Sequence, residues 1–312
     1  MKRKYSLTLI VLSFSLAFSS CIEFERQKLT YIHDEEKDEL RVTLTYEGIF
    51  GNLDKGEYSQ KNRDDVATHD SLNLLQIDQL ESVLREKRAF FFSNWIAEYS
   101  KPSVEKMLKS IIKGNKHGKF GDPENKLIEL LHQNVEVQNI GFYKNKMGKL
   151  CGGQTLKISN ISQVLASANE VIQRQIVAHI PQLRKELIEN VPSAWSARTI
   201  DLIEKKLKGK FEFIRLEGNL MSFSTIIAEA EQKKLTDTSL KDLPSGARVE
   251  FRDAGIDILI GSKSKKVVHL SKKCFDGYQP NALNYVREQH SDLLLTKKEV
   301  GHHFRTFLSG VK

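Results

Sequence analysis

Four stretches of this chain alternate apolar and polar residues on both sides of a turn, and this alternation constrains the fold more than any other feature. The first covers residues 28–49, where Val42, Leu44 and Tyr46 alternate with polar residues after the acidic run 34–38. A period of two places alternate side chains on one face of a strand, so the pattern predicts a β-hairpin. The same pattern predicts hairpins at residues 135–158, 211–224 and 248–270.

Segments with apolar residues at three- and four-residue spacing separate the hairpins and predict helices. Asp122 and Pro123 open one helix, Pro181 is expected to break or kink a second over residues 160–189, and a third covers 194–208 between a Ser193 cap and Gly209. Further helices are predicted from residue 70, over 103–113, near 280–289 and from 296. Hairpins that alternate with helices predict an α+β fold with antiparallel sheets around a mixed core, since parallel units would place single strands between helices.

The final helix carries the most specific local pattern. Thr296 and Glu299 have the spacing of a capping box, in which each residue bonds the backbone of the other. Val300, Phe304 and Phe307 then recur at three- and four-residue intervals and form one apolar face. Such a face must be covered, either by the core of this chain or by a partner.

The N-terminus has the composition of a secretion signal. Lys2, Arg3 and Lys4 precede an uncharged apolar run over residues 6–20, which is shorter than the roughly twenty residues of a membrane-spanning helix. The end of this run together with the following cysteine, Leu16-Ala17-Phe18-Ser19-Ser20-Cys21, resembles the lipobox of bacterial lipoproteins, although Phe18 stands where that class usually has leucine. The resemblance implies cleavage before Cys21 and lipid on this cysteine, and two or more acyl chains anchor a protein stably to a membrane.

This resemblance also implies how the chain is divided and where it is located. Residues 1–20 are the expected signal peptide, 21–27 a lipidated tether, and 28–312 a globular region of one domain, or of two with a boundary near 134 or 210. The expected location is the cell envelope. Ile22 is not the aspartate that retains such proteins at the inner membrane in enteric bacteria, so the outer membrane is favoured where the source has one.

Two groups of side chains suggest contacts beyond simple core packing. Cys151 and Cys274 could form a disulfide in an oxidising envelope compartment, or could be two separate small apolar residues. The aromatic cluster around Phe90, Phe91 and Trp95 is too dense for one helix face, which suggests that part of it faces a partner.

The net charge of +8 falls to about +5 without the signal peptide, which is a mild excess, and two segments of the chain are rich in lysine. The members of these segments are Lys205, Lys206, Lys208 and Lys210, and Lys263, Lys265, Lys266, Lys272 and Lys273. Such faces can be solvated surface or can contact anionic headgroups, an anionic polymer or another envelope component. Nucleic acid is not the expected partner, because aromatic residues that could stack on bases do not alternate with these lysines.

The chain has no local signature of a known catalytic, metal-binding or cofactor-binding site. It contains neither a Gly-x-Ser-x-Gly elbow nor a His-Glu-x-x-His motif, and His302 and His303 are adjacent, so they point to different sides of a helix. We therefore expect no cofactor and no metal, and a binding or assembly factor is the favoured interpretation. The alternative is an envelope hydrolase whose catalytic residues are dispersed along the chain.

Overall fold

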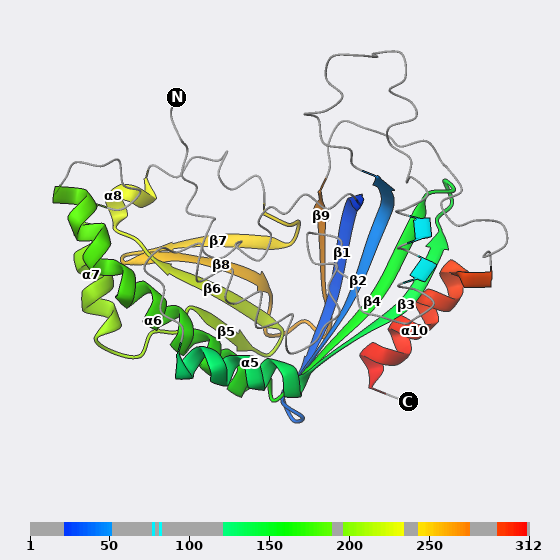
Figure 1. The fold of residues 1–312 in the computed structure, drawn as a ribbon, viewed down its shortest axis with the longest axis horizontal. Coiled ribbons are helices and arrows are strands. Elements are labelled where there is room, and N and C mark those ends of the chain that lie inside the picture. Colours follow the sequence, from blue (N-terminus) through cyan, green and yellow to red (C-terminus); the bar gives the residue numbers. More distant parts are fainter. Residues whose placement is uncertain are drawn as a thin grey trace, which may run out of the picture.

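The computed structural model describes residues 22–51, 77–78, 81–82, 121–188, 196–233, 243–274 and 292–310, and Figure 1 shows their arrangement. Two sheets and five helices lie in these ranges, which confirms the α+β prediction. No helix among them is long and apolar enough to cross a membrane.

Two predicted hairpins build the larger sheet. The first pairs β1 (Ile22–Asp34) with β2 (Glu39–Gly51), and the second pairs β3 (Val135–Lys144) with β4 (Leu150–Ser159). Strand β9 (Val268–Lys273) joins β1, and the short β10 (Leu294–Leu295) runs parallel to β3, so the order is β10-β3-β4-β2-β1-β9. Strand β1 already begins at Ile22, so residues 22–27 lie in the sheet and not in the predicted tether.

The smaller sheet has the order β5-β6-β8-β7. Its strands are β5 (Ile214–Glu217), β6 (Leu220–Ile226), β7 (Ala247–Arg252) and β8 (Gly255–Gly261). The third predicted hairpin is therefore present. The fourth is correct for β7 and β8 but wrong beyond them, because the chain leaves this sheet after Gly261 and continues as β9 beside β1.

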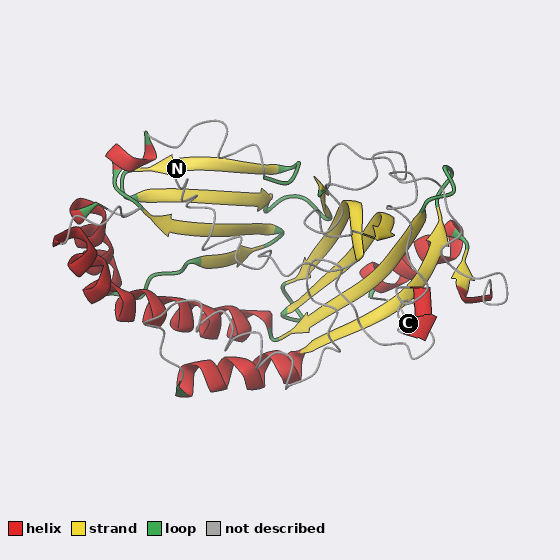
Figure 2. Cartoon of the chain, turned by 45° about the horizontal axis from the view of Figure 1, so that its top comes forward, coloured by secondary structure: helices red, strands yellow, loops and turns green. Residues whose placement is uncertain are grey.

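The helices pack beside the two sheets (Figure 2). They are α5 (Asp122–Asn134), α6 (Ile161–Ile188), α7 (Ala197–Leu207), α8 (Glu229–Gln232) and α10 (Lys297–Ser309). Helix α6 continues through Pro181 without a break. The cap of α7 is Ser196 and not Ser193, since the Ser196 hydroxyl accepts a hydrogen bond from the Thr199 N–H at 3.1 Å.

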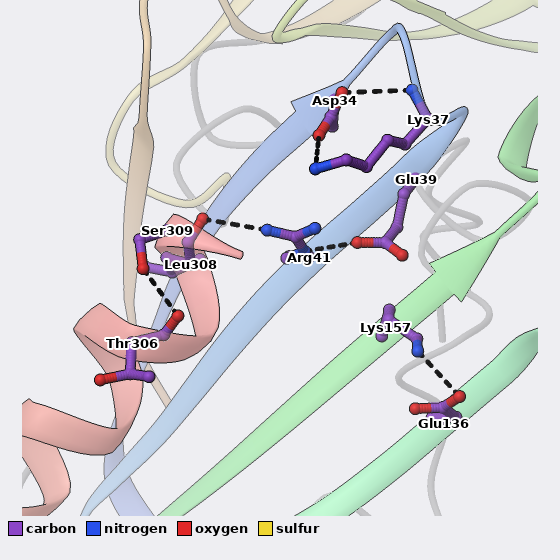
Figure 3. A network of polar contacts seen from close by, with 9 residues as sticks. All are labelled: Asp34, Lys37, Glu39, Arg41, Glu136, Lys157, Thr306, Leu308 and Ser309. Carbon is purple, nitrogen blue, oxygen red and sulfur yellow. Dashed lines mark hydrogen bonds and ion pairs between the residues drawn. The ribbon is translucent and has the colours of Figure 1, made fainter. Parts of the chain in front are cut away.

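Helix α10 covers part of one face of the larger sheet. Thr296 and Glu299 form the predicted capping box, and Val300 is buried against Tyr143 and Cys151. Phe304 is partly buried in the same cluster, so the core of the chain covers this part of the apolar face, as one of the two alternatives predicted, and Phe307 is half-buried. At the other end of α10, Arg41 on β2 donates a hydrogen bond to the Leu308 carbonyl (Figure 3).

The two sheets meet at a buried tyrosine. The Tyr31 hydroxyl on β1 lies 3.0 Å from the carbonyls of both Asn219 and Ile260, which belong to the smaller sheet and its β5–β6 turn. The Asn219 side chain in turn accepts a hydrogen bond from the His33 backbone N–H at 2.6 Å. Leu216, Met221 and Ile260 also pack against the core of the larger sheet, so polar and apolar contacts together join the sheets.

Candidate functional site: an arginine-bearing face of the smaller sheet

One face of the smaller sheet carries most of its charged side chains. Residues directly opposite on neighbouring strands point to the same face, and the pairing aligns Arg215, Ser222, Leu259 and Arg248 in one row. The adjacent row contains Ser224, Asp257 and Glu250, and Arg252 follows on β7. We call this set of residues the arginine face.

A buried carboxylate organises the arginine face. Asp257 is only 4% exposed, and its Oδ2 lies 3.4 Å from Nη2 of Arg215 and 2.5 Å from Nη2 of Arg252. Burial of an unpaired carboxylate is costly, so both guanidinium groups stabilise Asp257 where it is. In return, Asp257 fixes the positions of two arginines from different strands.

The guanidinium groups outnumber the carboxylates on this face. Arg248 donates to the Gly261 carbonyl at 2.8 Å and lies 3.6 Å from Glu250, and the side chains of Arg248 and Arg252 are 49% and 54% exposed. The Nε of Arg215 is buried and has no hydrogen-bond partner in the described ranges. Glu217, two residues after Arg215 on the same face, pairs with Lys263, so three guanidinium groups stand against Asp257 and Glu250 and leave a positive charge and unused N–H donors.

This arrangement suits an oxyanion ligand. A guanidinium group presents N–H donors in a planar fork that matches the oxygens of a carboxylate or a phosphate. Ser222 and Ser224 lie between Arg215 and Asp257 in the two rows, but both are buried, so the exposed donors of this face are the arginines of β7. The face can therefore bind an anion without a metal or cofactor.

The hydrolase alternative finds little support in the described ranges. Thr30 and His269 form a hydroxyl–imidazole hydrogen bond of 2.9 Å across β1 and β9, but it lies exposed on the sheet, and no carboxylate of the described residues bonds the imidazole. A catalytic imidazole is normally oriented by such a third group. Across the same ranges, no group of three or more His, Cys, Asp or Glu side chains is placed to hold a metal ion.

The structure leaves Cys151 and Cys274 as separate residues, the second of the two alternatives, and the sheet register explains why. Cys151 lies opposite Glu47 on β2, and the Cys274 N–H bonds the Glu25 carbonyl on β1, so strands β2 and β1 lie between the two cysteines. Three strand spacings correspond to roughly 14 Å, twice the separation that a disulfide tolerates. Burial raises the pKa of the Cys151 thiol, so this residue is an unreactive packing group.

The other predicted contact residues do not contribute to the arginine face. Cys21, Phe90, Phe91 and Trp95 lie outside the described residues. The first lysine segment lies exposed at the end of α7, and Lys263 in the second pairs with Glu217, whereas Lys272 and Lys273 belong to the larger sheet. The alternation of Arg248, Glu250 and Arg252 along β7 was the sequence signal that could have revealed this face.

Comparison with known proteins does not add a relationship: no protein-family model, no curated protein and no solved structure matches this chain.

Proposed function

We propose that this protein is a lipid-anchored binding protein of the bacterial envelope and that its ligand is an anionic envelope component bound at the arginine face. The observation that carries the proposal is the excess of guanidinium groups around Asp257, with a buried Arg215 Nε that lacks a partner in the described ranges. Guanidinium groups held in place by a buried carboxylate bind an oxyanion with less loss of side-chain entropy. A phosphate- or carboxylate-bearing polymer fits this chemistry.

The double variant Arg248→Gln/Arg252→Gln should weaken anion binding about tenfold or more, because each charge-assisted hydrogen bond contributes roughly 1.5–3 kcal/mol and 1.4 kcal/mol corresponds to tenfold. Fluorescence anisotropy with labelled polyphosphate measures this, and labelled polyglutamate tests the carboxylate class. The matched control is Lys205→Gln/Lys206→Gln at the exposed end of α7, which removes the same charge. Equal weakening by both double variants would contradict a specific arginine face.

Asp257→Asn should change the affinity for the anion in the opposite direction. Loss of this carboxylate leaves Arg215 and Arg252 without their shared partner, so anion binding should tighten while the free energy of unfolding falls. A purely structural ion network would lose stability without any gain in binding.

The lipid anchor is tested separately. The lipobox-like segment that ends at Cys21 supports lipidation, and the expected location is the envelope, with the outer membrane favoured. The full-length protein should incorporate radiolabelled palmitate and fractionate with membranes, whereas Cys21→Ser should incorporate none. Absence of label in the wild type would contradict the lipid anchor. It would not affect the proposed anion binding at the arginine face, which is tested separately.

A further inference from the structure

The end of the larger sheet beside Cys21 brings several strand ends together. Strand β1 starts at Ile22, opposite Gly51, the last residue of β2. At the same edge β3 ends at Lys144, opposite Leu150, and β9 ends at Lys273, opposite Arg26. We call this edge the anchor end; it is the upper edge of the larger sheet in Figure 1. A lipid on Cys21 would be separated from it by a single peptide bond, so the anchor end would lie at the bilayer surface.

Basic residues predominate at the anchor end. Six basic residues (Arg26, Lys144, Lys146, Lys149, Lys272 and Lys273) stand beside three acidic ones (Glu23, Glu25 and Glu47) in the strand ends and in the β3–β4 turn. Two of the acidic residues form ion pairs within the protein, Glu25 with Lys149 and Glu47 with Lys28, both at 2.6 Å. Among the described residues of this end the surplus charge is therefore positive, as expected for contact with anionic headgroups.

The β3–β4 turn presents an apolar side chain among these lysines. Met147 at its tip is 67% exposed, and Lys144 and Lys146 beside it are also exposed. The Asn145 side chain fixes the turn, because its Oδ1 accepts hydrogen bonds from the N–H groups of Met147 at 2.9 Å and Lys149 at 3.0 Å. An apolar side chain flanked by lysines is suited to the membrane interface, where the apolar group enters the acyl boundary and the ammonium groups remain among the headgroups.

The opposite end of the same strands is acidic. The β1–β2 turn contains five acidic residues and one lysine in the sequence from Asp34 to Glu39, and Figure 3 shows its Asp34–Lys37 and Glu39–Arg41 pairs. Strand β1 has 13 residues, which separates the two ends by roughly 40 Å. An anionic membrane would therefore attract the anchor end and repel the β1–β2 turn.

We propose that the anchor end is a docking surface for bilayers that contain anionic lipid, and that it orients the domain with the β1–β2 turn away from the membrane. The lysines of the β3–β4 turn and of β9 contact the headgroups, and Met147 enters the interface. This inference rests on the proposed lipid anchor, because Cys21 selects this edge of the sheet. It adds a second attachment, of electrostatic origin, to the lipid.

Vesicle flotation of the unlipidated Cys21→Ser protein tests the docking surface. The protein should float with vesicles that contain phosphatidylglycerol and remain behind with phosphatidylcholine alone, and added salt should release it. Lys144→Gln/Lys146→Gln/Lys273→Gln should weaken partitioning about a hundredfold, since each lysine near an anionic bilayer contributes roughly fivefold. Equal partitioning into both kinds of vesicle would overturn the proposal.

A control variant identifies the surface that binds. Lys205→Gln/Lys206→Gln/Lys208→Gln removes the same charge at the end of α7. It should partition like the parent protein. If it lowers vesicle binding as much as the anchor-end variant does, the docking proposal is wrong. The protein in the flotation test carries no lipid. A failure to bind vesicles is therefore distinguishable from a failure to incorporate palmitate.

Met147→Trp reports on insertion directly. Its fluorescence should shift to shorter wavelength with phosphatidylglycerol vesicles, because the indole leaves water, and should not shift with phosphatidylcholine vesicles. Val177→Trp is the matched control, since Val177 is an exposed apolar residue on α6. An equal shift at both positions, or none at residue 147, would contradict docking through the turn.

Discussion

Gly261→Ala should lower the free energy of unfolding by about 4 kcal/mol, through backbone strain, overpacking and a lost hydrogen bond. Gly261 ends β8 with a φ of +80°, a conformation that disfavours residues with a Cβ atom. An added Cβ would lie 2.2 Å from the Asn219 carbonyl oxygen and 2.8 Å from the Tyr31 hydroxyl. The contact that joins the two sheets would therefore have to open. Urea unfolding of the Cys21→Ser protein, followed by circular dichroism, measures the change.

Gly209→Ala is the matched control for this substitution. Gly209 follows α7 without a positive φ, and the nearest atom to an added Cβ is the Lys206 carbonyl oxygen at 4.0 Å. Its stability should change by less than about 1 kcal/mol, in either direction. If Gly261→Ala is equally mild, the contact between Tyr31, Asn219 and Gly261 does not hold the sheets together.

The hairpins and helices could be predicted because their signals are local. The turn residues of β1–β2 and β5–β6 are adjacent in sequence to the strands that they connect, and the Thr296–Glu299 capping box spans four residues. The cap of α7 was misplaced by three residues because Ser193 and Ser196 have the same capping chemistry. Local pattern thus established the elements but not every boundary.

The partnerships between distant segments could not be predicted from local pattern. Strand β9 pairs with β1 across more than 230 residues of chain, and no periodicity within β9 indicates which sheet it joins. The same limitation left the state of Cys151 and Cys274 open, because only the register places two strands between them. The arginine face was missed because Arg215 and Asp257 belong to different hairpins and meet only when the sheet forms.

Tyrosine ionisation should make this protein unstable in alkali. Burial raises the pKa of Tyr31 from 10.0 to about 12. Burial also raises the pKa of Tyr46 and, together with the nearby Cys151 and Glu47, that of Tyr143. Above pH 10 the unfolded chain loses these protons while the folded chain keeps them, so stability is full below pH 10 and falls as pH rises towards 12. Each such tyrosine contributes about 1.4 kcal/mol per pH unit to this loss.

Tyr31→Phe isolates the contribution of one of these tyrosines. At neutral pH the variant should be less stable by about 1–3 kcal/mol, because the Asn219 and Ile260 carbonyls lose their buried donor. Between pH 10 and 12 the difference between wild type and variant should shrink by about 1.4 kcal/mol per pH unit, since only the wild type must retain this proton on folding. Urea unfolding at a series of pH values measures this difference in stability. Both proteins contain the same lysines, so the effect of lysine titration cancels in the difference. A gap that stays constant across this range would mean that Tyr31 ionises as easily in the folded protein as in water, which its position between the two sheets does not permit.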